Sequence, residues 1–305
     1  MKGKWKKVKR QEAEKEIAAA NEQMQEKFLP LELFEILGME RLQGQPENLL
    51  GERVKLRAGI LNINIAGFQE RIIRMEEKEV YYLINSILAC CIPEIYQAGG
   101  CVDHFMNAGV TALFTENAEM GLNAAVSICE KIGRLQTQEK EYEHFSIGIC
   151  YGDVMIGMVG HDERMSVLTL SAYTGFGEFL QQIAPKYYAR ILASGSYVEQ
   201  VENCRTRFNS RFLGYMYISS SGVAEKVYDI FDGDTAAIRN QKRKTRMVFE
   251  KGVGLFLERS FAEARLYFIE VLKTDRYDRA AMEYVLLCDK YSSGESKAGI
   301  YIEVY

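Results

Sequence analysis

The sequence lacks several features that would assign it to a common class of protein. Its seven cysteines are odd in number, lie in apolar segments and include no CxxC pair. This pattern predicts buried, reduced thiols rather than disulfides or a thiolate metal site. No apolar run reaches the ~18 residues of a membrane-spanning helix, and the basic start has no apolar signal-peptide segment. Together these absences predict a cytoplasmic protein.

The chain also lacks a large excess of charge of one sign. Its 305 residues include 38 Lys and Arg against 42 Asp and Glu, which gives a net charge of −4. Nucleic-acid-binding domains usually carry a basic patch or stripe, so the composition predicts no nucleic-acid partner. With 48% hydrophobic residues, the chain can bury a full core. Its length fits one large domain with appendages or two modest domains.

Residues 1–27 are strongly charged and predict a helix. Ile17, Met24 and Phe28 recur at near-heptad spacing, which leaves two alternatives: a short parallel coiled coil or a solvated, frayed helix. Six basic residues precede this seam. They suggest peripheral contact with an anionic membrane surface, although no apolar face accompanies them.

Strands and helices alternate between residues 52 and 232. The strand-like runs are VKLRAGILNINI, GGCVDHFMNAGVTALFTE, FSIGICYGDVMIGMVG, SVLTLSAYT and ARILASGSYV. Residues 77–96 carry apolar side chains every three or four positions, which predicts a helix packed on a sheet. The MNAG segment predicts a hairpin turn, because Asn and Gly tolerate positive φ. The YGD segment suggests a second hairpin.

After residue 234 the apolar period becomes helical. Residues 241–291 predict three helices, and the SFAE segment, Ser260–Glu263, predicts a capping box. The pair 261–274 and 278–291 resembles one tetratricopeptide-style helical hairpin. A single repeat of this kind cannot form a core alone. We therefore expect the tail, residues 235–305, to dock on the main domain or on a partner.

Five segments in register resemble the catalytic domains of class III nucleotidyl cyclases. They are FLPLELFEILGMERL, ILNINIAGFQERI, INSILACCIPEIYQAGGCVDHFMNAGVTALF, FSIGICYGDVMIGMVGHDERM and EKVYDIFDGD. The resemblance covers residues 28–234 and implies an α+β, ferredoxin-like sandwich. It also implies a head-to-tail homodimer with two composite active sites. The N-terminal helix and the small helical tail would flank this cyclase-homology domain.

The resemblance also implies six chemical positions, and all six are substituted here. The family's DIxGF is NIAGF, its DKFxGDAxMAxF is DHFMNAGVTALF, and its GDAVNLASR lies over SAYTGFGEF. The two metal-binding aspartates thus fall on Asn64 and Ala108, the base-reading Lys and Asp on His104 and Ala172, and the Asn and Arg of the transition state on Gly175 and Phe179. The scaffold positions still match: Gly67, Phe68, Phe105, Phe114, Gly148, Gly152, Gly157, Gly160, Glu163, Arg164 and Met165.

These substitutions predict that the cyclase reaction is lost. Magnesium prefers anionic oxygen, and Asn64 offers no charge while Ala108 offers no ligand. Loss of a Lewis acid removes several kcal/mol of transition-state stabilisation, roughly a thousandfold or more in rate. Phe179 also removes a cation that would offset charge on the phosphate. We therefore expect no catalytic, cofactor-binding or metal residue, and a dimeric signalling or scaffold module.

Two other functions remain open. One is an adenylate or guanylate cyclase that works through displaced residues with Mg or Mn and ATP or GTP. The other is a metal-independent nucleotide or small-molecule sensor. A heterodimer with a competent cyclase is a further hypothesis. Because each composite site takes one half from each subunit, the resemblance implies that both sites of such a heterodimer would be inactive.

Individual residues near these motifs have structural interpretations. We interpret Asp103 as structural and Asp153 as a solvated turn residue, while His104 either reads a base or makes a hydrogen bond at an interface. The GFGEF segment lacks the third glycine of a phosphate loop. Phe176 and Phe179 are therefore predicted to be packing residues that fill the former nucleotide cleft.

Overall fold

The computed structural model describes residues 31–38, 51–136, 145–161, 164–218, 223–293 and 302–304. The helix predicted for residues 1–27 lies outside these residues. The elements are α2 (Leu31–Ile36), β1 (Arg53–Ile65), α3 (Phe68–Ile72), α4 (Glu77–Gln97), β2 (Cys101–Met106), β3 (Gly109–Phe114), α5 (Ala118–Gln136), β4 (Phe145–His161), β5 (Arg164–Leu170), α6 (Ala172–Ile183), the 3-10 helix η3 (Ala184–Tyr187), β6 (Ile191–Ser194), α7 (Gly195–Gln200), α8 (Cys204–Arg207), β7 (Ser210–Ile218), β8 (Val223–Ile230), α9 (Ala236–Leu257), α10 (Phe261–Thr274), α11 (Arg279–Ser292) and β9 (Ile302–Val304). None of the described helices is long and apolar enough to cross a membrane.

The chain divides into two compact units. The smaller contains the described residues up to Val54 together with Ile156–Thr169, and the larger contains the rest. In the smaller unit β5 pairs with β4, and the amide of Met158 donates to the carbonyl of Glu52 at 2.9 Å. Leu33 and Phe34 of α2 are buried. The short helix α2 therefore contributes apolar side chains to a core.

The strands form one mixed sheet. Their order is β2-β3-β1-β4-β6-β8-β7-β9, with β5 beside β4. Most neighbours are antiparallel, while β4 and β6 run parallel. This sheet with its helices confirms the predicted α+β, ferredoxin-like class. The strand β9 pairs parallel with β7, so the tail predicted as helical also adds a strand.

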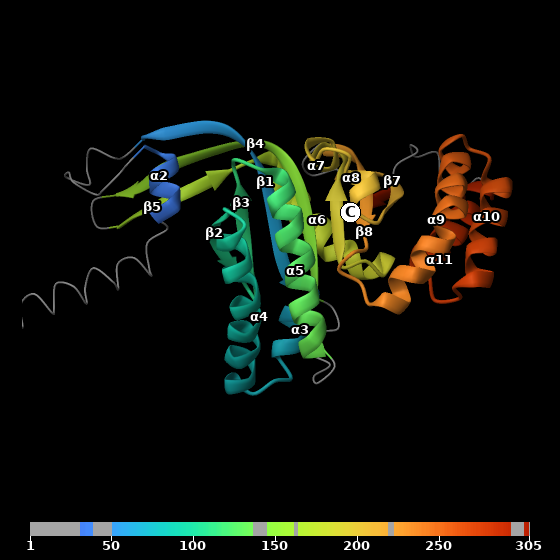
Figure 1. Ribbon diagram of the computed structural model, residues 1–305, viewed down its shortest axis with the longest axis horizontal. Coiled ribbons are helices and arrows are strands. Elements are labelled where there is room, and N and C mark those ends of the chain that lie inside the picture. The colour runs from blue at the N-terminus through green and yellow to red at the C-terminus, as the bar shows by residue number, and fades with distance from the viewer. Residues whose placement is uncertain are drawn as a thin grey trace, which may run out of the picture. The chain divides into compact units, whose positions relative to one another are not determined.

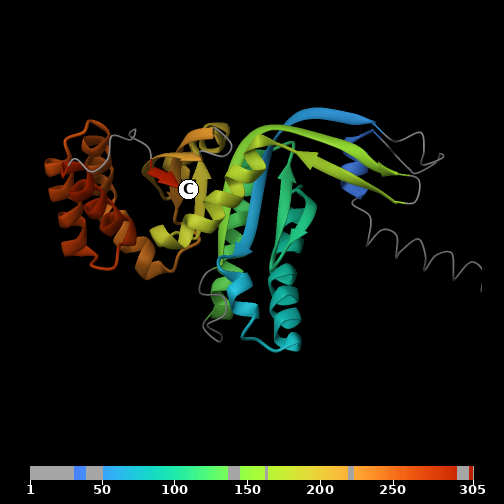
Figure 2. The same ribbon diagram turned by 180° about the vertical axis from the view of Figure 1, so that it is seen from behind.

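Helices cover both faces of the sheet around β1 and β4. Leu61, Ile63 and Ile65 pack into the large apolar core that α4 and α5 complete, and Figure 1 shows these two helices side by side on that face. Asn62 lies on the opposite face and contacts α6. Figure 2 shows this side of the sheet. Because both faces are covered, β1 is buried without interruption from Ala58 to its end. The predicted helix of residues 77–96 is confirmed as α4.

The tail contains the three predicted helices, α9 to α11. Phe249 of α9 lies 5.5 Å from Phe268 of α10, and Phe268 stacks on Tyr284 of α11 at 4.6 Å, between ring centroids. These rings form an aromatic core among the three helices. The tyrosine hydroxyl also donates to the carbonyl of Leu213 in β7. The expected docking of the tail on the main domain is thus observed.

The YGD segment is not a hairpin turn. Strand β4 runs through it from Phe145 to His161. A Cβ on Gly152 would lie 2.1 Å from the ring of Tyr173, so this glycine permits close packing rather than a turn. The MNAG hairpin is confirmed: β2 and β3 pair antiparallel with Met106 opposite Gly109, and Asn107 has φ 41°.

Three further predictions about element ends were wrong. The run SVLTLSAYT is strand only to Leu170, because Ser171 caps α6 by accepting the amide of Tyr173. The run ARILASGSYV likewise ends as a strand at Ser194, whose side chain caps α7. Ser260 does precede α10, but its side chain makes no capping bond. Its ψ of 59° lies outside the extended region in which an N-cap oxygen faces the helix amides.

Candidate functional site

A glycine in the left-handed conformation forms the turn at the end of β1. Gly67 has φ 68° and ψ 23°, in the left-handed region, and immediately precedes α3. Glycine adopts this conformation without steric cost. Phe68 follows and is 5% exposed. The glycine turn of the family motif is therefore preserved.

The two family metal positions lie side by side. Asn64 is 7% exposed, and its Oδ1 accepts the backbone amide of Ile65 at 2.8 Å. Ala108 is completely buried. It precedes Gly109, where a Cβ would lie 2.8 Å from the Cα of Asn64 and 1.7 Å from the carbonyl oxygen of Ile63. The glycine thus allows β3 to approach β1 closely and brings the two positions together.

These two positions do not fit a divalent cation. The side-chain oxygen of Asn64 already accepts a backbone N–H, and alanine has no donor atom at Ala108. Magnesium and manganese prefer anionic oxygen ligands, whereas these two positions offer between them one neutral amide oxygen. Among the residues that the structure describes, no cluster of three or more His, Cys, Asp or Glu could hold a metal ion.

Asn62 is a buried hydrogen-bonding residue whose partners the sequence did not indicate. Its Nδ2 donates to the carbonyl of Thr174 at 3.2 Å, and its Oδ1 accepts the hydroxyl of Thr111 at 2.9 Å. A Cβ on Gly177 would lie 2.2 Å from that Nδ2. The amide therefore joins β1, β3 and α6 at a point of close helix–sheet contact.

A second pair of buried polar side chains lies on the same face of the sheet. Ser146 of β4 donates to the carbonyl of Gln181 in α6 at 2.8 Å, and the Gln181 amide donates back to the serine hydroxyl at 3.0 Å. The same amide reaches the backbone carbonyl of Asn64 at 3.4 Å. In the sequence, the only sign of this neutral network is a polar residue placed inside an otherwise apolar strand. It satisfies buried polar groups without any charge.

The three remaining substituted positions of the base and transition-state half lie along α6. Ala172, Gly175 and Phe179 have i, i+3 and i+7 spacing, so they share one helix face. Ala172 and Gly175 are exposed and Phe179 is half-buried. None of these side chains carries a hydrogen-bond donor or acceptor. These three positions therefore offer no side-chain group that could hold a base or a phosphate.

The GFGEF segment lies inside α6 and is not a loop. Phe176 is completely buried, and its ring stacks on that of Phe179 with 6.1 Å between centroids. Gly175 faces open space, whereas Gly177 packs against Asn62. The prediction that Phe176 is a packing residue is confirmed. Phe179 packs on it from a half-buried position.

His104 is exposed and paired with its neighbour. Its Nδ1 lies 2.7 Å from Oδ2 of Asp103, whose side chain is only 6% exposed. The register of β2 against β3 shifts between Val102 and His104, which is the mark of a β-bulge. The hydrogen bond to Asp103 raises the pKa of His104 above its ordinary value, and Glu178 of α6 adds to the effect. The ring is thus biased towards its protonated form.

Two other sequence expectations can be compared with the structure. Asp153 is exposed, as predicted, but it lies within β4 rather than in a turn and pairs with Lys55 at 3.0 Å. All seven cysteines are free, and all but Cys90 are buried. Burial raises the pKa of the Cys129 thiol to about 12. The prediction of buried thiols is confirmed for six of the seven.

Comparisons with known proteins show which sequences this chain resembles. No family model matches the chain. A terminal-differentiation-specific adenylate cyclase of Dictyostelium discoideum is 24% identical over 273 residues, which cover 86% of this chain and 12% of that protein. An adenylate cyclase of Anabaena cylindrica is 25% identical over 198 residues, covering 62% of this chain and 38% of that protein. The chain therefore spans less than half the length of either relative.

A solved structure shares the fold. A bacterial light-regulated adenylyl cyclase superposes with a TM-score of 0.60 at 19% identity, covering 76% of this chain and 68% of that chain. At this identity the likeness shows a shared fold.

Proposed function

Because the chain is related in sequence to adenylate cyclases and has the fold of class III adenylate/guanylate cyclase catalytic domains, we propose that it is a catalytically inactive cyclase-like domain. Its output would be shape and partner binding, as a dimeric signalling or scaffold module. The observation that carries this proposal is the pair Asn64 and Ala108. Gly109, which follows Ala108, packs closely against the backbone of Asn64, and neither of the two positions carries a carboxylate.

The face of α6 supports the same proposal. In the family this face supplies the residues that read the base and stabilise the transition state from across a dimer interface. Here it carries Ala172, Gly175 and Phe179. A homodimer of this chain would combine an uncharged metal half with an apolar transition-state half in each composite site. A heterodimer with a competent cyclase would contain one defective half in each site.

A turnover assay tests the proposal. Purified protein is incubated with ATP or GTP and Mn²⁺, and cyclic nucleotide is measured by mass spectrometry beside a competent class III cyclase. We expect product at the level of the protein-free blank. Product that increases with the concentration of this protein would refute the proposal and favour the cyclase alternative. The mixed dimer is tested by co-purification with the competent cyclase, which should lose activity.

A nucleotide or small-molecule sensor is the second candidate function. The exposed ring of His104, oriented by Asp103 and biased towards protonation, could donate to a base or a phosphate. Isothermal titration with ATP and GTP, without metal, distinguishes this candidate. Saturable binding that is lost in His104→Ala would support a sensor, and absence of heat at millimolar nucleotide would leave the scaffold function.

A further inference from the structure

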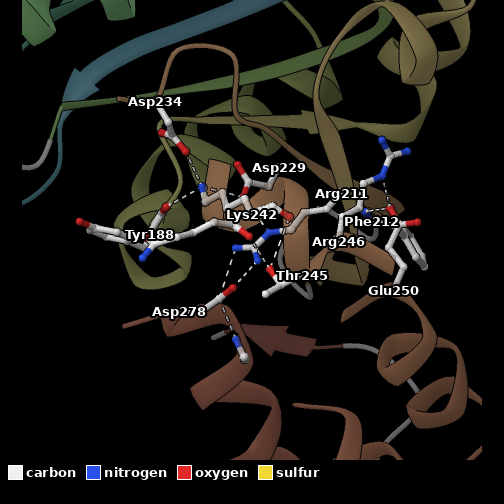
Figure 3. A network of polar contacts seen from close by, with 12 residues as sticks. Tyr188, Arg211, Phe212, Asp229, Asp234, Lys242, Thr245, Arg246, Glu250 and Asp278 are labelled. Carbon is white, nitrogen blue, oxygen red and sulfur yellow. Dashed lines mark hydrogen bonds and ion pairs between the residues drawn. The ribbon is translucent and has the colours of Figure 1, made fainter. Parts of the chain in front are cut away.

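The tail is attached to the sheet by a buried network of charges (Figure 3). Arg211 of β7 donates to Asp278 at the start of α11 at 2.5 Å and to Asp229 of β8 at 3.0 Å. Lys242 of α9 lies 2.9 Å from Asp229 and 2.6 Å from Asp234. All five side chains are 2% exposed or less. The network thus joins two strands, a loop and two tail helices.

The same tail helices also contact the segment that follows α6. Lys242 also donates a hydrogen bond to the carbonyl of Tyr188 at 2.9 Å. Arg279 of α11 lies 5.7 Å from the ring of Tyr188 and 3.5 Å from the carbonyl of Pro185. Lys186 pairs with Glu283 of α11 at 3.0 Å. Two tail helices therefore contact η3 and the residue after it.

The contacted segment has an unfavourable backbone conformation. Tyr188 has φ 53° and ψ 42°, in the left-handed region. A bulky residue rarely adopts this conformation unless its surroundings hold it there, because it costs on the order of 1–3 kcal/mol. The lysine and arginine contacts occur at this residue. The tail is thus positioned to keep the end of α6 and η3 in one conformation.

The segment η3 follows directly on α6, the helix of the candidate site. Helix α6 ends at Ile183, and η3 begins at the next residue. One turn earlier, Gln181 bonds Ser146 and the carbonyl of Asn64. A shift of η3 would therefore move a side chain that contacts the strand carrying the first family metal position.

We propose that the helical tail is a positioning element for α6, acting through Lys242 and Arg279 on the Tyr188 segment. A change in the tail would then alter the helix face of the candidate site. This role does not depend on whether that site turns over a nucleotide. The bond from Tyr284 to Leu213 and the bond from Arg211 to Asp278 already attach the tail to β7. The contacts with Tyr188 and Pro185 are therefore additional to attachment.

Hydrogen exchange of the whole chain tests the proposal. In Lys242→Met the bond to Tyr188 is lost, and we expect amides of the last turn of α6, Phe179–Ile183, to exchange about tenfold faster. The matched control is Lys244→Met, an exposed lysine two residues away on α9. It should leave α6 unchanged. Faster exchange in α9–α11 with unchanged α6 would overturn the proposal, as would no change in either.

A second variant covers the case in which Lys242→Met does not fold. Arg279 is exposed, so Arg279→Ala should keep the circular dichroism spectrum of the parent protein. It removes the contacts with Pro185 and Tyr188, and we expect about threefold faster exchange of the same α6 amides. Unchanged α6 exchange in folded Arg279→Ala would overturn the proposal independently of the lysine variant.

Discussion

Two groups of buried polar residues in the larger unit are satisfied differently. Between β1, β4 and α6 the groups are neutral: Asn62, Thr111, Ser146 and Gln181 exchange hydrogen bonds with one another and with the backbone. At the tail junction the groups are charged: Arg211 and Lys242 contact Asp229, Asp234 and Asp278. The resemblance implies that cyclases of the family carry a metal-binding aspartate beside the neutral group, at the position of Asn64. In this chain the buried ion pairs described above lie at the tail junction instead.

The difference has a physical reason. An unpaired buried charge costs several kcal/mol, so charge persists inside a protein only where partners surround it. At the tail junction Arg211 holds the pKa of Asp278 below its ordinary value despite burial. At the end of β1 the hydrogen-bond partners of Asn64 are the backbone amide of Ile65 and the side-chain amide of Gln181, and both are neutral. An aspartate there would lack compensation unless a metal ion were bound, whereas asparagine keeps the hydrogen bond without the charge.

The largest expected effect comes from breaking the charged network. Arg211→Met leaves Asp278 buried without its cation, while Asp229 keeps only Lys242, and we expect the free energy of unfolding to fall by about 3–5 kcal/mol. Urea denaturation followed by circular dichroism measures this loss. Arg265→Met is the control, because its ion pair with Asp289 is partly exposed and is worth about 0–1 kcal/mol. Equal losses of stability in Arg211→Met and Arg265→Met would refute the claim that the buried network matters more than an exposed ion pair.

Breaking the neutral network should cost less. Asn62→Leu has similar volume but leaves the Thr111 hydroxyl and the Thr174 carbonyl without their partner. We expect a loss of about 1–3 kcal/mol in the same denaturation experiment. Asn240→Leu, at an exposed position of α9, should change stability little. A loss above that of Arg211→Met would contradict the comparison between the two regions.

Two glycines of α6 provide a matched pair. Gly177→Ala brings a Cβ to 2.2 Å from the Asn62 amide nitrogen, and overpacking of this kind costs about 1–3 kcal/mol. Gly175→Ala enters open space and should stabilise the helix by about 0.5–1 kcal/mol. The opposite signs are checked by thermal unfolding of the two variants side by side. Destabilisation by both substitutions would show that another group packs against Gly175.

The smallest effect concerns the exposed pair at β2. Asp103→Asn replaces the charged hydrogen-bond acceptor that raises the pKa of His104 with a neutral one, so the histidine pKa should fall, as NMR titration of the ring would measure. In the parent protein the raised pKa means that the pair stabilises the fold below about pH 6.5. That contribution is lost as pH rises through the folded pKa. An unchanged pKa in the variant would exclude Asp103 as the cause.

The sequence allowed much of this architecture to be predicted, and the failures have identifiable causes. The five motifs and the apolar periods predicted the fold class, α4, the β2–β3 hairpin and the three tail helices. The ends of β5 and β6 were missed because Ser171 and Ser194 cap helices, and a serine in an apolar run does not reveal this. Gly152 was assigned to a turn because close packing against Tyr173 is visible only in three dimensions.

The candidate site was predicted as positions rather than as contacts. The resemblance identified Asn64 and Ala108, and the structure brings them together. The partners of Asn62 could not be predicted, because Thr174 lies 112 positions further along the chain. The same limit applies to the charged network, in which Arg211 and Asp278 are 67 positions apart. Such pairs depend on tertiary structure.

Turnover of ATP or GTP by the purified protein tests the central claim most directly. With Mn²⁺ present, we predict that cyclic AMP and cyclic GMP stay at the level of the protein-free blank. Asn64→Ala should give the same result, because we propose that the parent residue contributes nothing to catalysis. Product formation by the parent protein that disappears in Asn64→Ala would contradict the account, since it would make Asn64 a working ligand.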